Sequence, residues 1–225
     1  VVSPDAERPL SGVRVIDLTV AVAGPIATQL LAGLGADVIR IETPWGRPRV
    51  PTTVAPPLDG AADEAWNRFP LFNELHLGKR SVALNLLEPM GRATLLDLVR
   101  VSDVLVENFS PRVMGNFDLE WEQLQAANPG LIFVSMPAFG KHGPHRDRVS
   151  YGPGIDAMSG LSWLTGYSDG APLKPGNFYC DQNAGLHAAF AVVSALRERE
   201  RTGRGQTVEL AMLEGELQLL GDALV

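Results

Sequence analysis

Asp181 is the side chain on which the chemistry of this sequence is most readily built. It follows an extended run and precedes a long apolar segment, which predicts a helix over about residues 182–201. One interpretation is that Asp181 caps this helix, because an Asp side chain accepts hydrogen bonds from the first free N–H groups. The other is that a carboxylate at a helix start, in a loop lined by Gly176 and Gly185, is a nucleophile or an acid/base group. The residues alone leave both interpretations open.

Other catalytic patterns find little support in the sequence. Cys180 is the single cysteine, and His187 stands two turns along the expected helix, too far to activate it directly. A small buried thiol is therefore the better interpretation of Cys180. The sequence has no P-loop and no G-x-S-x-G nucleophile elbow. We expect no metal site, because no metal-ligand spacing connects the four histidines, which are His76, His142, His145 and His187.

The elements that must position Asp181 alternate between strand and helix. Apolar, β-branched runs predict strands over 12–19, 37–42, 79–86, 103–109, 131–139 and 206–211. Helical patterns cover 26–34, 88–101, 121–127, 155–164 and 182–201, and the Pro-rich segments 43–70 and 140–154 read as loops. This alternation predicts a Rossmann-like, doubly wound α/β fold with a mainly parallel sheet and helices on both faces. Ligands of such sheets bind beyond the carboxyl ends of the strands.

A dinucleotide site at the first strand is disfavoured. Glu42 stands where a ribose-binding acid would be expected, but the turn Thr19–Pro25 lacks the G-x-G-x-x-G pattern that admits a pyrophosphate. Pro25 also removes one N–H group that would hold phosphate.

Composition narrows the class of protein. The 225 residues carry a net charge of -7, with 45% hydrophobic and 20% charged residues, as in an ordinary soluble domain. The acidic balance argues against a nucleic-acid partner. No apolar run reaches the length of a membrane span, so we expect no membrane partner. A lone cysteine points to a reducing compartment, and we expect a cytoplasmic protein.

Several motifs, in this order and spacing, resemble those of family III CoA-transferases, the group of formyl-CoA transferase, carnitine CoA-transferase and α-methylacyl-CoA racemase. The resemblance covers nearly all of the chain. The motifs are LSGVRVIDLT (10–19), AGP (23–25), LGADVIRIE (34–42), KRSVALNL (79–86), DVLVENF (103–109), YGP (151–153) and RTGRGQTVE (201–209).

The resemblance implies that residues 1–225 form the N-terminal part of a CoA-binding large domain, with Asp181 as the catalytic residue. In such transferases the Asp attacks an acyl-CoA thioester, an aspartyl anhydride forms, and an acceptor carboxylic acid later takes the CoA. Coenzyme A thioester is then a substrate, and no tightly bound cofactor is expected. The CoA contacts carried over by the resemblance are Val22, Ala23, Thr43, Leu84, Asn85, Leu86, Leu87, Asn108, Phe109, Ser110, Arg112, Asn116, Arg148 and Tyr151.

Some of these positions depart from the family pattern. Thr43 and Asn116 stand where Arg is frequent, and Arg112 is a nearby substitute for a phosphate contact. The His of the racemase His/Asp pair falls at Tyr151, whose ordinary pKa is too high for an easy base at neutral pH. We therefore favour a transferase over a racemase or epimerase.

Family members are also considerably longer than this chain, which starts without Met and stops inside a helical pattern. We expect a fragment or a natural half whose missing small domain binds the acceptor. A CoA-binding module that is inactive without that domain is a further alternative. The resemblance implies an interlocked homodimer for the full-length protein.

Overall fold

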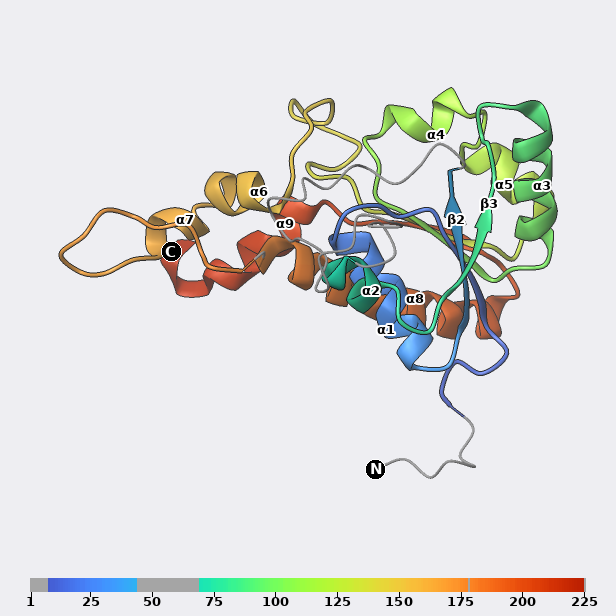
Figure 1. Cartoon of the computed structure of the whole chain (residues 1–225), viewed down its shortest axis with the longest axis horizontal. Helices are drawn as coiled ribbons and strands as arrows, with labels where there is room; N and C mark the ends of the chain where they lie inside the picture. The colour runs from blue at the N-terminus through green and yellow to red at the C-terminus, as the bar shows by residue number, and fades with distance from the viewer. Residues whose placement is uncertain (1–7, 44–68, 178, 225) are drawn as a thin grey trace.

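Strands and helices alternate in the computed structural model, which describes residues 8–43, 69–177 and 179–224 (Figure 1). The strands are β1 (Arg14–Asp17), β2 (Asp37–Glu42), β3 (Arg80–Ala83), β4 (Val104–Glu107), β5 (Ile132–Ser135) and β6 (Gln206–Glu209). The helices are α1 (Ala23–Gly33), α2 (Pro70–Leu75), α3 (Pro89–Arg100), α4 (Arg112–Asn116), α5 (Trp121–Ala127), α6 (Gly152–Ser159), α7 (Leu161–Leu164), α8 (Tyr179–Thr202), α9 (Met212–Leu217) and the 3₁₀ segment η2 (Gln218–Leu224).

The strands form one parallel sheet in the order β3-β2-β1-β4-β5-β6. The chain moves outward from β1 to β3, then returns to the other side of β1 and continues to β6. This is the doubly wound order, and the predicted fold class is confirmed. The strand order reverses between β1 and β4, so the crevice of the fold opens beyond the carboxyl ends of those two strands.

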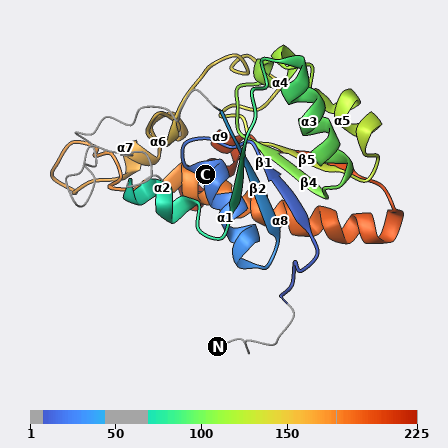
Figure 2. The ribbon, with the colours of Figure 1, turned by 45° about the vertical axis from the view of Figure 1, so that its right-hand side comes forward.

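Each face of the sheet buries its own apolar cluster, because successive side chains of a strand point to opposite faces. Val15 packs with α1 and α8 on one face, and the next residue, Ile16, packs with α3 and α5 on the other. Figures 1 and 2 show α1 and the long α8 below the sheet, with α3 and α5 on the opposite side. Both central strands flanking the crevice are therefore fixed from two sides.

Glycine permits the close contact between α1 and α8. A Cβ on Gly185 of α8 would lie 2.6 Å from Cγ2 of Ile26 and 2.9 Å from the carbonyl oxygen of Ala23. Gly185 therefore sits inside a helix–helix contact, and the expectation that it lines a loop is wrong. The contact places the start of α8 directly beside the turn that precedes α1.

The structure differs from the predicted elements at several boundaries. The single helix expected over 155–164 is two helices, because Gly160 adopts a left-handed conformation (φ 98°) that ends α6. The loop expected over 140–154 is shorter, since α6 already begins at Gly152. The short helix α4 was not predicted, and neither was α2, which starts at the last residue of the expected loop 43–70. The rest of that loop, residues 44–68, lies outside the described residues.

Candidate active site

Asp181 lies inside the first turn of α8, two residues after Tyr179. The expected helix start just after Asp181 is therefore wrong, and Asp181 does not occupy the capping position. Its side chain is buried, with 8% exposure. A Cβ on Gly152, the first residue of α6, would lie 2.0 Å from Asp181 Oδ2, so the carboxylate rests directly on a glycine backbone.

Burial, together with the negative charge of Asp156, raises the pKa of Asp181 from its ordinary 3.8 to about 6. A hydrogen bond from the backbone of Ala23 opposes the shift in part. A carboxylate in the first turn of a helix would usually be stabilised by the helix dipole. Here desolvation outweighs that effect, and the result is a carboxylate that is ionised at neutral pH but unusually basic.

Asp156 accepts one of the free N–H groups at the start of α8. The backbone N–H of Cys180 donates to Asp156 Oδ1 at 3.2 Å. Asp156 comes from α6, so the hydrogen-bonding role that the sequence suggested for Asp181 belongs in part to a residue far from it in the chain. Cys180 itself is fully buried, and burial with three nearby carboxyl groups raises the pKa of its thiol far above the usual range. The interpretation of Cys180 as a small buried thiol is confirmed.

The turn between β1 and α1 forms the wall of the crevice facing Asp181. Ala21 adopts a left-handed conformation (φ 59°), which is uncommon and costly for a residue with a Cβ. The side chain of Asn108, just after β4, spans the crevice: the N–H of Val20 donates to its Oδ1 (2.8 Å), and its Nδ2 donates to the carbonyl of Val20 (2.9 Å). This double hydrogen bond fixes the strained turn against the end of β4.

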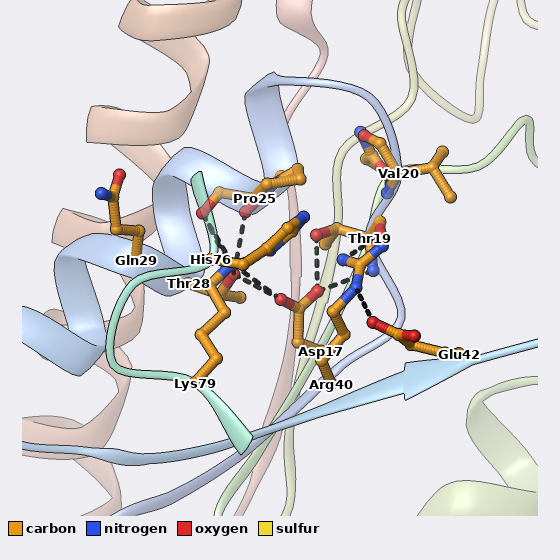
Figure 3. Close-up of polar contacts among 12 residues, drawn as sticks. Asp17, Thr19, Val20, Pro25, Thr28, Gln29, Arg40, Glu42, His76 and Lys79 are labelled. Carbon is orange, nitrogen blue, oxygen red and sulfur yellow. Dashed lines mark hydrogen bonds and ion pairs between the residues drawn. The ribbon is translucent and has the colours of Figure 1, made fainter. Parts of the chain in front are cut away.

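A buried ion pair supports the same turn from below (Figure 3). Lys79 Nζ lies 3.0 Å from Asp17 Oδ2, and the two side chains are only 1% and 0% exposed. Asp17 Oδ1 also accepts from the backbone N–H of Thr19 (2.8 Å), and Lys79 donates to the hydroxyl of Thr28 (2.7 Å) and to the carbonyl of Pro25 (3.0 Å). Burial raises the pKa of Asp17, but the Lys79 charge and the hydrogen bonds outweigh it and lower the pKa overall. Burial lowers the pKa of Lys79, and the Asp17 charge opposes that change. Both ends of the β1–α1 turn are therefore tied to the sheet.

Arg40 completes this support. Its guanidinium donates to the carbonyl of Thr19 (3.1 Å) and lies 3.4 Å from the carboxylate of Glu42. Glu42, which resembles a ribose-binding acid in position, thus has a cationic partner in its own strand.

The sequence-predicted CoA contacts nearest to Asp181 come together around the crevice. Val22 is the half-buried residue that precedes α1, and the backbone of Ala23 reaches the Asp181 carboxylate. Tyr151 precedes Gly152 and is 72% exposed. Beyond β4, Asn108, Phe109 and Ser110 are half-buried, and Asn108 contacts the β1–α1 turn through the double hydrogen bond described above.

Other predicted contacts lie toward the far side of the sheet. Thr43 directly follows β2 and is exposed, and residues 84–87 follow β3. Arg92 of α3 donates to the carbonyls of Leu86 and Leu87, and Asn85 Oδ1 accepts from the N–H of Leu87. Leu84 and Leu86 pack against the α3 and α5 cluster, whereas Leu87 is 70% exposed. The contacts that hold this segment thus run to α3 rather than to α8.

The predicted phosphate contacts are all on the surface. Arg112 and Asn116 are the first and last residues of α4, and Arg148 stands in the loop before α6; all three are exposed. They leave basic groups near the carboxyl edge of the sheet, where a phosphate would meet water-exposed cations.

Sequence reasoning missed three residues around Asp181: Gly152, which contacts its carboxylate; Asp156, whose charge acts on it; and Glu216 of α9, which is fully buried near Asp156. For Asp156 the available signal was a carboxyl residue among apolar neighbours, in Ile155–Met158; Glu216 stands in a segment that also carries Glu214 and Gln218, and no such signal distinguishes it.

Two further features bound the chemistry. No group of three or more His, Cys, Asp or Glu in the described ranges is arranged to hold a metal ion. Within the same ranges, the helices are too short or too polar to cross a membrane.

A groove of about 800 Å³ lies between α1 and α8, lined by apolar side chains such as Leu34, Leu186 and Phe190. None of the predicted site residues lines it.

The sequence model of CoA-transferase family III matches residues 10–225. The succinate–glutarate CoA-transferase of Agrobacterium fabrum is 37% identical over 227 residues, which cover 97% of this chain and 54% of that protein. A formyl-CoA:oxalate CoA-transferase of Bradyrhizobium is 40% identical over 213 residues, 94% of this chain and 48% of the relative. The chain spans about half the length of the curated relatives it matches.

Solved structures agree with the sequence matches. A CAIB/BAIF family protein from Brucella suis superposes with a TM-score of 0.86 at 35% identity, over 96% of this chain and 56% of that one. Rv3272 from M. tuberculosis gives a TM-score of 0.84 at 31% identity, over 97% and 57% of the respective chains.

Proposed function

The chain belongs to CoA-transferase family III, and we propose that its protein moves coenzyme A from an acyl-CoA to a carboxylic acid, with Asp181 as the covalent nucleophile. The observation that carries this proposal is the environment of Asp181. Burial gives it a pKa of about 6, so at neutral pH it is ionised yet more basic than an exposed carboxylate. The relatives described above, which are named as CoA-transferases, support the substrate class.

The proposed reaction is a chain of three exchanges on Asp181. First, one carboxylate oxygen attacks the thioester carbon, the C–S bond breaks, and CoA leaves as thiolate from a mixed aspartyl anhydride. Second, the acceptor carboxylate attacks Cγ of Asp181, the C–O bond to the donor acyl group breaks, and the donor acid leaves. Third, the CoA thiolate attacks the acceptor's carbonyl carbon and the Asp181 carboxylate is released. Each step exchanges one nucleophile for one leaving group, so no cofactor is consumed.

The residues around Asp181 supply protection and placement for these steps. A mixed anhydride must be shielded from water, and the 8% exposure of Asp181 provides that shield. We propose that the β1–α1 turn with Val22 and Ala23 receives the thioester end of CoA. The exposed cations Arg112 and Arg148 are proposed to neutralise its phosphates. The remaining predicted contacts, from Thr43 to Tyr151, are proposed to line the rest of the CoA path.

The wider setting of the proposal follows from family membership. We propose an interlocked homodimer in the cytoplasm, with acyl-CoA and a carboxylic acid as partners and with no tightly bound cofactor. Residues beyond this chain would complete the acceptor pocket, because the chain corresponds to about half of each relative.

Trapping of the acylated Asp181 tests the proposal. The protein at its full encoded length is incubated with a panel of acyl-CoAs, treated with hydroxylamine, and digested for mass spectrometry of the peptide that carries Asp181. A hydroxamate on Asp181, absent from an Asp181→Asn variant that still binds CoA, is the expected result. Transfer activity that survives in the Asp181→Asn variant would overturn the assignment.

A racemase or epimerase is the second candidate, because a carboxyl group with a pKa of about 6 also suits proton transfer. The exposed Tyr151 offers no easy second base. Deuterium entering the α-carbon of an acyl-CoA in D₂O, with no exchange of CoA and no hydroxamate, would establish this candidate instead. CoA binding without either reaction would leave a binding module.

A further inference from the structure

A pair of buried carboxyl groups lies near Asp181. Asp156 of α6 is 1% exposed and Glu216 of α9 is 0% exposed, and their carboxyl groups are within hydrogen-bonding range of each other. Three of their four oxygens, Asp156 Oδ2 and both oxygens of Glu216, make no hydrogen bond of good geometry among the residues that the structure describes, although Ser159 and Cys180 lie close enough to affect Glu216. Buried carboxyl oxygens are rarely left in this state, so their arrangement calls for an explanation.

A shared proton accounts for it. The nearest hydroxyl and thiol do not replace this proton: Ser159 Oγ donates to the carbonyl of Asp156 (3.1 Å) and the Cys180 thiol faces the carbonyl of Met212 (3.9 Å). Both groups also act on Glu216 and oppose the rise of its pKa, but burial and Asp156 have the larger effect. A proton held between Asp156 Oδ2 and Glu216 would satisfy one oxygen of each carboxyl group. Two buried carboxylates that share a site cannot both ionise readily.

The proton belongs mainly to Glu216. Asp156 Oδ1 accepts the Cys180 N–H at the positive end of α8, where a negative charge is favourable. Glu216 lies on α9, away from that helix end, and the opposing effect of Ser159 and Cys180 on its pKa is smaller than that of burial and Asp156. Burial, with Asp156 as neighbour, raises the pKa of Glu216 to about 8. At neutral pH the pair thus keeps one negative charge.

The other charged and titratable groups near the pair come from α8, α9 and η2. From α8, Cys180 and Asp181 face it, and neither is a cation. His187 Nδ1 lies 3.6 Å from the position of a Cβ on Gly215. On α9 and η2, Glu214 and Asp222 are exposed.

We propose that Asp156 and Glu216 share one proton and that the single negative charge they retain makes Asp181 a stronger nucleophile. This inference rests on the proposed function. Acylation converts the Asp181 carboxylate into a neutral anhydride, while the negative charge leaves on the CoA sulfur. The repulsion between Asp156 and Asp181 is relieved in that step, so the retained charge raises the free energy of the reactant carboxylate relative to its acylated form.

Two variants that differ only in the charge at Asp156 isolate this effect. Glu216→Gln replaces the protonated acid by an amide that still donates to Asp156, and leaves the Asp156 charge in place. The double variant Asp156→Asn/Glu216→Gln removes that charge but keeps an oxygen for the Cys180 N–H. Glu214→Gln, on the exposed side of the same helix, is the matched control. All are made in the protein at its full encoded length.

The first readout is the titration of Asp181 by carbon NMR of carboxyl-labelled aspartate, with Asp181→Asn to assign the signal. The midpoint is expected near 6 in the wild type, in Glu214→Gln and in Glu216→Gln, and clearly lower in the double variant. An inflection near pH 8, from Glu216, should be present in the wild type and absent from Glu216→Gln. This readout does not require turnover, so it is independent of the transferase assignment.

The second readout is the rate of hydroxylamine-trapped acylation at neutral pH. With the Brønsted slope of thiolates as a guide, the rate constant of a nucleophile changes about threefold for each unit of its pKa. For each unit by which the pKa of Asp181 falls, acylation in the double variant should therefore be about threefold slower than in Glu216→Gln. An unchanged Asp181 midpoint in the double variant would refute the acid-pair proposal while leaving Asp181 as nucleophile. A normal titration with no acylation in any variant would instead refute the proposed function. Should the double variant fail to fold, Asp156→Asn alone must lower the midpoint, and an unchanged midpoint there refutes the proposal equally.

Discussion

Replacing Asp181 with Asn should abolish acyl transfer and, at neutral pH, stabilise the folded protein. The pKa of Asp181 rises from 3.8 to about 6 on folding, because the carboxylate is buried and lies near the Asp156 charge. The stability associated with its protonated form is therefore complete below about pH 3.8 and is lost as the pH rises through about 6. A shift of about two units, at roughly 1.4 kcal/mol each, amounts to about 3 kcal/mol of lost stability near pH 8.

Asn keeps the shape of the side chain and an oxygen that can accept from the backbone of Ala23, but it carries no charge. Its packing effect on stability does not depend on pH, so the comparison between acidic and alkaline conditions isolates the electrostatic effect. Urea unfolding of wild type and variant at about pH 4 and about pH 8 gives that comparison. The stability advantage of the variant should grow by about 2–3 kcal/mol between the two conditions.

Asp169→Asn, in an exposed turn, provides the matched control and should show no such growth. The reasoning is refuted if the difference between wild type and Asp181→Asn is the same at both pH values. It is equally refuted if the variant is less stable, relative to wild type, at the higher pH. In either case the ionised carboxylate would not lower the free energy of unfolding, and the proposed reaction would have to proceed with a carboxylate of ordinary pKa.

Three more changes test the support of the site. Lys79→Met should destabilise the protein by about 3–5 kcal/mol, because it leaves the buried Asp17 without its cation, and Asp17→Leu in the same chain should recover part of the loss in urea unfolding. Gly152→Ala should slow transfer on the order of 10²-fold with the fold intact by circular dichroism, since a Cβ 2.0 Å from Asp181 Oδ2 must displace the carboxylate. Asn108→Ala should weaken CoA binding in calorimetry and cost about 1–3 kcal/mol of stability, because both hydrogen bonds to the β1–α1 turn are lost; unchanged affinity would show that the turn holds its shape unaided.

The sequence predicts the sheet well because its strands are local signals. Runs such as Asp37–Glu42 and Val104–Glu107 are β-branched, apolar and bounded by turn residues, and each became a strand buried between two helical layers. The helices that were missed or misjudged depend on less local causes. α4 has only five residues, too few for a periodic pattern, and the break at Gly160 follows from one left-handed residue.

The position of Asp181 in its helix could not be obtained from the sequence for a related reason. The pattern of an Asp before an apolar run fits a cap, and nothing nearby indicates that α8 begins by Tyr179. The competing acceptor is Asp156, on a different helix, and its contact with the Cys180 N–H exists only after α6 and α8 pack. The contact between the Asp181 carboxylate and Gly152 could not be predicted either, because the glycine in YGPG gives no local sign that a side chain from α8 packs against it.

The consequence for reactivity follows from this displacement. At a capping position the side chain of Asp181 would accept N–H groups at the positive end of α8, and both effects would lower its pKa. Two residues further on, one of those N–H groups is taken by Asp156, whose charge then acts on Asp181 in the opposite direction. The close approach of α8 to α1 at Gly185 and to α6 at Gly152 excludes water from the same carboxylate. Helix packing thus converts a residue that resembles a stabilising cap into a basic, shielded carboxylate, which is what covalent transfer requires.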